Sequence, residues 1–489
     1  MSIQATSQNN KKIKILNADK TYANVNLHPD YWRLIGNVSF SHNNTIMKCD
    51  SAFHYINEDR IQAFGKININ QGDSIILTGK NLNYFGKKNI ANIKGNVAFQ
   101  DKYMQLNTEE IIYDLNENIA SYPKKGIIID NEKTIRSKKG AYQANNYVFI
   151  FKDSVIVVGK DYIINTDNMH YNSNNEISYF YGPSLIISDR KTIYCENGWY
   201  NTKSDIAQFR ENAYIRNENN VLQGDSLYYN KKMNYGQAIS NVKLIDTLEN
   251  ISIYGGFAEY FEIQEEIIIT KKPILNIILQ NDTLFMHAKQ FVTQNHHLNK
   301  KLIAYNNVKF FKKDLQGKCD SLSYNFKDSV IQMFKSPIIW SEKFQMTSDS
   351  IQFLIKKNQI EKMFLKNNPI IIEQKDSLDF NQIRGKLMIG KFSDNKITSM
   401  DIIGNGQSIF YVKDEEKKIG LNYTESSDLT LYFKNNKLDK INYELKPNSL
   451  TIPYKDIKND HRFLKGFIWR NSEQPKSKND IFITDSILK

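Results

Sequence analysis

The chain is poor in cysteine and has no long apolar run. Only three of its 489 residues are cysteine. No segment of the sequence comes near the roughly 18 consecutive apolar residues that a membrane-spanning helix needs. A Gly-rich phosphate loop, a Gly-x-Ser-x-Gly motif and a Cys-x-x-Cys pair are also missing from the sequence. These absences remove the common sequence signatures of nucleotide-binding, serine-hydrolase and thiol-redox sites.

An export signal is missing from the sequence as it stands. Residues 1–14 are polar and lack the apolar core of a signal peptide. We therefore expect either that the protein stays inside the cell or that a signal lies upstream of Met1. Residues 1–12 are expected to be disordered.

The charge of the chain is positive but spread out. The net charge is +12 and the isoelectric point is about 9.1, which favours acidic partners such as phosphorylated lipids, anionic glycans or nucleic acid. Lys and Arg are scattered over the whole chain rather than gathered in one stripe with aromatic residues. This distribution argues against a nucleic-acid-binding face.

What the chain does contain is a strict period of 29 residues. Six tyrosines stand at this spacing: Tyr84, Tyr113, Tyr142, Tyr171, Tyr200 and Tyr229. A fixed period of this length is typical of stacked repeats, in which each repeat buries its apolar face against its neighbours. Tyr55 also precedes Tyr84 by 29 residues, but the flanking pattern places His54 in the repeated position. The repeated tyrosine is interpreted as the edge of a core rather than as a sugar-stacking ladder.

Two columns of residues accompany each periodic tyrosine. Seven residues earlier the side chain is aliphatic, and five residues earlier the residue is small. The aliphatic column contains Leu77, Leu106, Ile135, Ile164, Ile193, Leu222 and, before Tyr260, Ile253; the small column contains Gly79, Thr108, Ser137, Thr166, Cys195 and Gly224. The β-branched and aromatic pattern predicts a strand, and the small residue predicts a bend or bulge within it.

A second strand follows each tyrosine after a polar turn. It passes through Gly-Asn or a similar pair, as in Gly36-Asn37-Val38-Ser39-Phe40, which predicts a second bend. Bent antiparallel strands of this kind stack into two sheets that share an edge, with apolar side chains inside and polar ones outside. The predicted fold is therefore all-β: an elongated repeat stack of bent antiparallel strands, an open V-shaped β-jellyroll with about a dozen repeats of about 29 residues.

The stack is expected to cover residues 13–440, regular to residue 260 and looser from 261. Residues 441–489 lose the pattern and are expected to form a capping or partly disordered tail. The side chains expected to line the apolar trough are Val38, Phe40, Ile67, Ile69, Leu77, Val97, Phe99, Leu106, Ile135, Ile164, Ile193, Leu222, Val242, Leu244, Ile253, Val308 and Phe310. Small residues two before the tyrosine position, Gly140, Gly198 and Ala258, are expected to leave room inside.

The residues capable of chemistry all have a structural interpretation. Cys49, Cys195 and Cys319 occupy the small column several repeats apart, too far for a disulfide, which needs Cα atoms within about 7 Å. The acidic column Asp50, Glu109, Asp167, Glu196, Asp225, Asp320 and Asp349 supplies one carboxylate per repeat. It is read as a solvent-facing ladder rather than a catalytic pair or a Ca²⁺ site. His296-His297 has no carboxylate at ligand spacing. We expect no catalytic residue, no metal and no cofactor.

The repeat resembles that of the OstA-like family. The resemblance rests on Gly-Asn-Val-x-Phe followed by segments such as Leu222-Gln223-Gly224-Asp225-Ser226-Leu227-Tyr228-Tyr229, and it runs over about residues 13–440. Including residues 464–470, the whole chain looks like the long OstA-like proteins of some Gram-negative bacteria. The family includes the periplasmic bridge protein of lipopolysaccharide transport and the periplasmic N-terminal domain of its outer-membrane translocon. The resemblance implies a periplasmic protein whose trough carries lipid acyl chains, without catalytic residues; the missing signal departs from the family.

Three functions of different class follow. A lipid-conducting bridge for lipopolysaccharide or a related glycolipid predicts an open, continuous apolar lining. A structural or adhesive rod predicts a trough packed shut by large side chains, and a β-helical carbohydrate-active enzyme predicts polar groups converging on one repeat. We favour the bridge, joined to other OstA-like transport components by strand addition at its edges near Ile13–Leu16 and Leu429–Phe433. No nucleic-acid partner and no transmembrane segment are expected.

Overall fold

The computed structural model describes residues 12–483 except 25–27, 73–74, 102–104, 130–132, 190, 280–281, 297–298, 358, 395, 416 and 435–436. The disorder expected for residues 1–12 thus falls almost wholly outside the described residues. The chain divides into two compact units, one of Met1–Glu218 with Asp225–Met233 (unit 1) and one of Asn219–Gly224 with Asn234–Lys489 (unit 2). The described residues hold 38 strands in one hydrogen-bonded sheet, and the predicted all-β class is confirmed.

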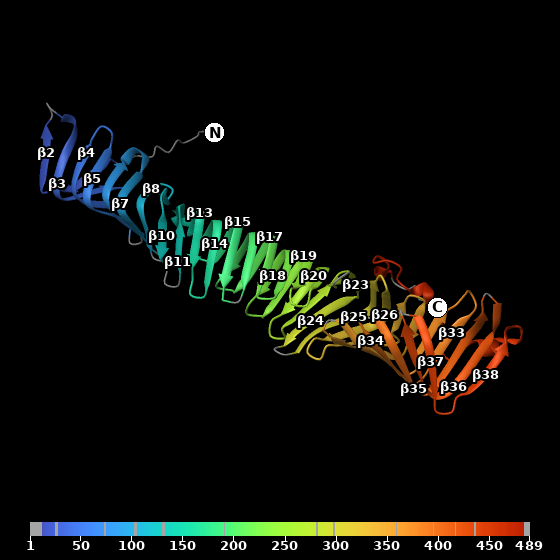
Figure 1. The fold of residues 1–489 in the computed structure, drawn as a ribbon. Helices are drawn as coiled ribbons and strands as arrows, with labels where there is room; N and C mark the ends of the chain where they lie inside the picture. Colours follow the sequence, from blue (N-terminus) through green and yellow to red (C-terminus); the bar gives the residue numbers. More distant parts are fainter. Residues whose placement is uncertain are drawn as a thin grey trace, which may run out of the picture. The chain divides into compact units, whose positions relative to one another are not determined.

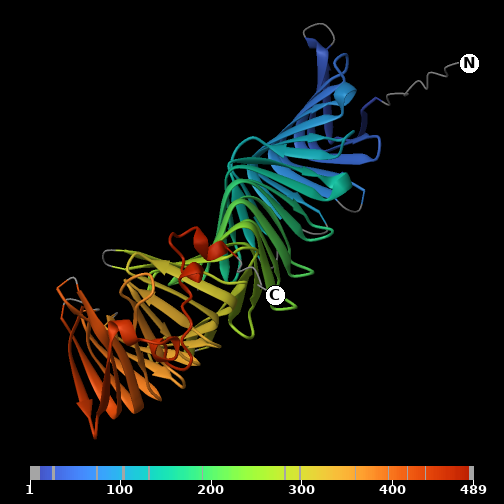
Figure 2. The same cartoon turned by 90° about the vertical axis from the view of Figure 1, so that its right-hand side faces the viewer.

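Unit 1 contains most of the regular repeats. Its strands are β1 (Lys14–Asn17), β2 (Lys20–Asn24), β3 (His28–His42), β4 (Thr45–Tyr55), β5 (Arg60–Gln71), β6 (Ile75–Phe85), β7 (Ile90–Gln100), β8 (Gln105–Asp114), β9 (Ile119–Tyr122), β10 (Gly126–Ile129), β11 (Thr134–Ser137), β12 (Lys139–Gln143), β13 (Val148–Val158), β14 (Tyr162–Asn172), β15 (Ile177–Ser188), β16 (Thr192–Asn201), β17 (Ile206–Arg216) and β18 (Asn220–Asn230), which is shared with unit 2. Short 3-10 turns, η1 (Gly86–Lys88) and η2 (Ala144–Asn146), connect some of them. Successive strands lie side by side as bent ribbons (Figures 1 and 2).

A corner divides each long strand into two halves. Strand β5 pairs with β6 on both sides of Gly65, but the register shifts between Phe64 and Ile67. Gly65 has a φ of 75° and Lys66 a φ of 41°, a left-handed pair that turns the strand sharply. Comparable register shifts fall beside Gly79, Thr108, Thr166 and Cys195. The bends predicted at the small residues are therefore present.

The strand halves assemble into two arms. The halves that carry the periodic tyrosines, such as 60–64 and 81–85, form the tyrosine arm, and the other halves, such as 67–71 and 75–78, form the facing arm. Alternate residues of both arms are buried between them: Ile61, Ala63, Ile67 and Ile69 in β5 are at most 1% exposed. We call this the inner face, and the gap between the free ends of the arms the mouth. Each arm thus buries one side and solvates the other.

Unit 2 continues with strands of more varied length, from 4 to 19 residues. They are β19 (Tyr235–Asp246), β20 (Ile251–Phe261), β21 (Glu266–Thr270), β22 (Ile274–Ile278), β23 (Thr283–His287), β24 (Gln290–His296), β25 (Asn299–Lys312), β26 (Leu315–Asn325), β27 (Val330–Phe334), β28 (Ile338–Ser341), β29 (Phe344–Thr347), β30 (Ser350–Lys356), β31 (Gln359–Lys366), β32 (Ile370–Gln374), β33 (Phe380–Arg384), β34 (Leu387–Ser393), β35 (Lys396–Asp414), β36 (Lys417–Lys434), β37 (Lys437–Glu444) and β38 (Asn448–Pro453). Residues 429–433, expected at a free edge, instead lie in β36 and pair with both β35 and β37. The edge prediction was wrong because the strand pattern continues to Pro453.

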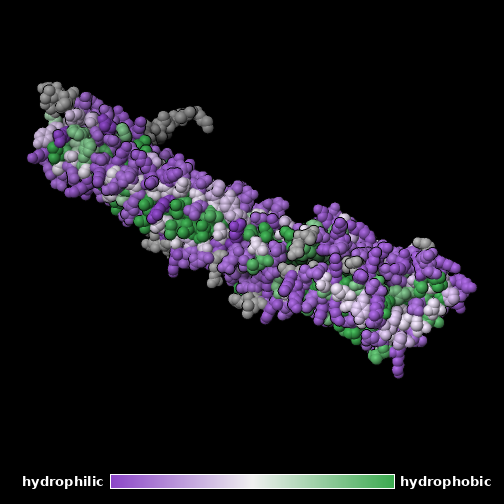
Figure 3. Space-filling view, in the orientation of Figure 1, coloured by the Kyte–Doolittle hydropathy of each residue, from purple (hydrophilic) through white to green (hydrophobic). Residues whose placement is uncertain are grey.

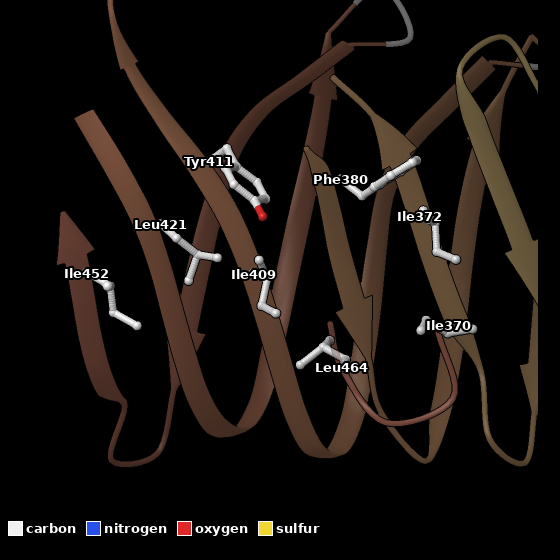
Figure 4. Packing of buried hydrophobic residues seen from close by; sticks show 8 residues of the cluster. All are labelled: Ile370, Ile372, Phe380, Ile409, Tyr411, Leu421, Ile452 and Leu464. Atoms are coloured by element: carbon white, nitrogen blue, oxygen red, sulfur yellow. The ribbon is translucent and has the colours of Figure 1, made fainter. Parts of the chain in front are cut away.

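Residues 454–483, which we call the tail, turn back from β38 and contain only short helical turns. These are η3 (Tyr454–Asp456), α1 (Asn459–Arg462), η4 (Asn471–Glu473) and η5 (Asp480–Phe482). Leu464 of the tail belongs to the same buried cluster as Ile370, Ile372 and Ile409 of the sheet (Figure 4). The tail is therefore part of the folded body of unit 2.

Candidate functional site

The inner face of unit 1 carries a continuous apolar ladder. Ile69 lies opposite Leu77, Leu77 opposite Phe99, and Phe99 opposite Leu106. The ladder continues through Ile128, Ile135, Val157, Ile164, Ile186, Ile193 and Ile215. In unit 2, Leu244, Ile253, Leu275, Met286 and Phe310 follow one another in the same manner. The aliphatic residues that precede the tyrosines therefore occupy every second position of the ladder. The strands between them supply the other positions, such as Ile128 and Val157, which were not among the predicted lining residues.

The seventeen residues expected to line the trough lie within this apolar layer. Fifteen are at most 6% exposed: Val38, Phe40, Ile67, Ile69, Leu77, Val97, Phe99, Leu106, Ile135, Ile164, Val242, Leu244, Ile253, Val308 and Phe310. Ile193 and Leu222 are half-buried. Their burial is provided by other side chains of the protein.

The interior of unit 1 is filled by large side chains. Tyr84, Phe99, Tyr113 and Phe180 have no exposed surface. The room expected at Gly140 and Gly198 is not there, because a Cβ atom at Gly140 would collide with the Tyr122 ring. At Gly198 it would meet the backbone of residues 208 and 209. The small residues accommodate neighbouring groups of the core rather than leaving a void.

Periodic tyrosines close the mouth of unit 1 by contacts with the tip of the opposite arm. The Tyr113 hydroxyl donates to Gln71 Oε1 at 2.5 Å, and Gln71 Nε2 donates to Asn118 Oδ1 at 3.1 Å. Tyr84 hydrogen-bonds His42 Nδ1 in the same manner, one repeat earlier. Gln71 and His42 end strands of the facing arm, whereas both tyrosines lie near the tip of the tyrosine arm.

Two further tyrosines repeat the contact with different partners. The Tyr142 hydroxyl donates to Asp101 Oδ2 at 2.5 Å, and Lys133 Nζ lies 3.8 Å from the centre of the Tyr171 ring. Burial raises the pKa of the Tyr84 and Tyr113 hydroxyls well above the usual value, so these hydroxyls keep their protons. We call the four tyrosines, Tyr84, Tyr113, Tyr142 and Tyr171, the tyrosine row.

The closure loosens along the chain. Tyr84 and Tyr113 are 0% exposed, Tyr142 is 2% and Tyr171 is 8% exposed, while Tyr200 and Tyr229 are half-buried. The Tyr200 hydroxyl donates at 3.0 Å to Asp205, which lies on the tip of its own arm. The inner face follows the same trend, because Leu77 is 0% exposed and Ile193 is half-buried.

His54, and not Tyr55, occupies the repeated tyrosine position, as predicted. His54 is buried on the inner face, and burial lowers its pKa. Tyr55 lies on the outer face, where the Arg60 guanidinium stacks 3.7 Å from its ring centre and its hydroxyl is 3.5 Å from Gln62 Oε1 in the neighbouring strand. Its spacing of 29 residues from Tyr84 is therefore a coincidence.

The acidic column and the cysteines have structural positions. Asp50 pairs with Lys66 at 4.0 Å, and Asp320 pairs with Lys335 at 3.1 Å. Both lysines have a positive φ. The three cysteines are free and buried, and burial raises each thiol pKa to about 12. Within the described residues no cluster of three or more His, Cys, Asp or Glu side chains is placed to hold a metal. No described helix has the length and apolar character to span a membrane.

The tail of unit 2 packs on the outer face of the facing arm. Phe310 of the inner face lies opposite Gly317, and the same face continues through Ile339, Met346 and Ile371. Gln345 and Gln382 alternate with these residues and so point outward, toward the tail. Their side chains bind the tail main chain at two points each, which makes the tail a third layer.

The two glutamines bind in the same way. Gln382 Nε2 donates to the Arg462 carbonyl at 2.7 Å, and the Leu464 amide donates back to Gln382 Oε1 at 2.8 Å. Gln345 does the same with the carbonyl of Ile468 and the amide of Arg470, at 2.7 and 2.8 Å. Both glutamine side chains are fully buried. A primary amide can satisfy one main-chain donor and one acceptor at once. These four hydrogen bonds therefore involve the backbone of the tail and not its side chains.

The outer face of the facing arm in unit 1 also carries apolar side chains. Six aliphatic residues there are 39–49% exposed: Ile127, Ile129, Ile156, Val158, Ile163 and Ile187. Val158 lies opposite Ile163, and Ile163 opposite Ile187. Hydrophobic residues gather over strands β10–β15 in the space-filling view (Figure 3). A shallow depression of about 530 Å³ borders this strip beside Leu185, Tyr194 and Tyr214.

A comparison with known protein families identifies a match. A family model described as OstA-like protein matches residues 10–167 and 168–272, together just over half of the chain. No curated protein matches the sequence. The family match covers the regular repeats of unit 1 and reaches β21 in unit 2.

Proposed function

The chain belongs to the OstA-like family, and from that premise we propose that it is a periplasmic component that carries lipopolysaccharide or a related glycolipid along its inner face toward the outer membrane. The ladder from Ile69 to Leu106 supports this proposal, because it would offer acyl chains an unbroken series of apolar contacts. The net charge of +12 would attract phosphorylated head groups.

The closed interior sets a condition on this function. Because Phe99 and Leu77 have no exposed surface, an acyl chain can reach them only if the two arms part and the lipid replaces the contacts that are lost. The proposed bridge is therefore a trough that opens on loading, rather than a preformed channel.

Photo-crosslinking tests the proposal. A diazirine-bearing aliphatic amino acid at Ile193, on the inner face, should capture lipopolysaccharide in the cell envelope. The same amino acid at Ile187, 39% exposed on the outer face, is the matched control. Lipid captured at Ile193 but not at Ile187 supports the bridge; equal labelling at both, or labelling at neither, contradicts it.

A second candidate function is a structural or adhesive rod of the cell envelope. It is favoured by the packed interior, since Tyr84, Phe99, Tyr113 and Phe180 fill the space between the arms. A rod would keep its interior closed in the cell. Native mass spectrometry of the protein taken from its own envelope separates the two: a rod carries no co-purifying lipid.

In either function the end strands are suited to joining other proteins. β38 is mostly exposed, and Leu450 within it is 55% exposed. Exposed terminal strands bind partners by strand addition. We propose that other OstA-like transport components attach there and at β1.

A further inference from the structure

The tyrosine row and the ladder behind it show a gradient within unit 1. At one end the Tyr113 hydroxyl contacts Gln71 across the mouth, and Leu77 behind it is fully buried. At the other end the Tyr200 hydroxyl donates to Asp205 of its own arm tip, and Tyr162 at the start of β14 is among the groups that raise its pKa. Tyr200 and Ile193 are both half-buried there. The side chains at the mouth and on the inner face behind it are thus fully buried at one end and half-buried at the other.

We propose that the tyrosine row controls access to the inner face of unit 1, and that an amphiphile enters beside Tyr200 and advances toward Tyr84 by displacing one cross-mouth contact at a time. This inference rests on the proposed function and adds to it a route and the residues that control it.

The contacts are suited to stepwise opening. Each consists of one or two hydrogen bonds, or a cation–π contact, between side chains at the two arm tips. A hydrogen bond between protein groups exchanges for bonds to water at a modest net cost, so one contact can break while its neighbours hold. The bond partners that are released, such as the Asp101 carboxylate and Lys133, then lie at the rim where a polar head group would sit.

The row also explains why the partner side chain changes from repeat to repeat. His42, Gln71 and Asp101 each accept or share a proton with a tyrosine hydroxyl, so any of the three closes the mouth. A packing role for the ring alone would be served equally by phenylalanine. The Tyr84 and Tyr113 hydroxyls also lie 3.1 and 3.3 Å from Asn89 and Asn118 of their own arm tip, and the bond across the mouth is made in addition to these.

The first test removes hydroxyls without removing rings. In the full-length chain, Tyr84→Phe with Tyr113→Phe should raise lipopolysaccharide crosslinking from a diazirine amino acid at Leu77 several-fold, and leave crosslinking from Ile193 unchanged. Tyr55→Phe is the matched control, because its hydroxyl contacts Gln62 within one arm. A purely structural role would lower the unfolding temperature of the double variant without changing the ratio of Leu77 to Ile193 labelling, and that result would overturn the proposal.

The second test closes the mouth covalently. Gln71→Cys with Tyr113→Cys replaces one cross-mouth contact by two thiols that a short bis-maleimide can join. Uptake of the apolar dye 1-N-phenylnaphthylamine should be high before tethering and fall several-fold after it. The same variant is measured before and after the reaction, so a change in stability caused by the two substitutions affects both measurements equally. Unchanged uptake would overturn the proposed gate. If tethering lowers dye uptake but the diazirine at Leu77 or Ile193 captures no lipopolysaccharide in any variant, the proposed control of access is supported and the proposed lipid function is contradicted.

Discussion

Tyr113 and Gln71 are 42 residues apart in the sequence, yet the tyrosine hydroxyl lies 2.5 Å from the glutamine Oε1 atom. The two residues sit on opposite arms of unit 1, so their contact closes the space between the arms. Repeating that contact with each new pair of strands requires a tyrosine at a constant spacing. From Tyr84 through Tyr113 to Tyr142, the period of 29 residues is therefore the distance along the chain from one mouth contact to the next.

The corner glycines should be sensitive to substitution. A Cβ atom at Gly65 would collide with the Asp50 side chain, whereas at Gly72 it would meet nothing within 4 Å; both residues have a positive φ. We expect Gly65→Ala to lower the free energy of unfolding by about 1–3 kcal/mol and Gly72→Ala by about 1 kcal/mol or less. Urea denaturation measures both, and equal losses would show that the collision at the corner is relieved without cost.

The packed interior predicts a large penalty for a cavity. Phe99→Ala removes a side chain with no exposed surface, and substitutions of this kind cost about 3–5 kcal/mol. Ile76→Ala, in the neighbouring strand and 41% exposed, should change stability by no more than about 0.5 kcal/mol. A small loss for Phe99→Ala would mean that the interior is already loose, as an open trough would be.

The glutamine contacts predict local release of the tail. Gln382→Leu leaves the buried Leu464 amide and Arg462 carbonyl without the bonds that Gln382 provides, at about 1–3 kcal/mol for each unsatisfied group. The Leu464 amide should exchange its hydrogen faster, while amides of unit 1 keep their rates. Gln352→Leu, which loses only a bond from Lys366, is the control. Unchanged exchange at Leu464 would show that the tail is held by its apolar side chains alone.

The buried thiols predict a loss of stability at alkaline pH. Burial raises the pKa of the Cys319 thiol from 9.0 to about 12 in the folded protein, so the folded state keeps a proton that the unfolded chain gives up. This contribution is complete below about pH 9 and is lost progressively as the pH rises toward 12. Cys49 and Cys195 behave in the same way. Mass spectrometry should find all three thiols unmodified by iodoacetamide at pH 8 until the protein is unfolded.

The sequence was a good guide to the fold because its signals are local. The tyrosine spacing, the small residue five positions earlier and the Gly-Asn pairs all act within one repeat, and they correspond to strands, corners and turns of the structure. The abundant asparagine, which could be dismissed as a matter of composition, has a physical role as well. Asn89 and Asn118 occupy left-handed positions at arm tips, a conformation that asparagine tolerates better than most residues.

The mouth and the third layer could not be predicted because their partners are distant and irregular. His42, Gln71 and Asp101 share a position but not a residue type, so no column reveals them. Gln345 and Gln382 look like ordinary polar residues of strands until the tail is placed over them. The small size of Gly140 suggested a void, because the sequence does not show that the Tyr122 ring from a neighbouring strand fills the space.

The tail lies about a hundred residues after the strands that it covers, which has a consequence for biosynthesis. Trp340, Ile370 and Ile372 are buried beneath or beside residues that the ribosome adds about a hundred positions later. Until Leu464 and the residues after it have been made, the outer side of these strands faces water as an adhesive apolar surface. A chain stopped at Pro453 would keep that surface for good. Synthesis of the tail is therefore the step that covers this face of unit 2.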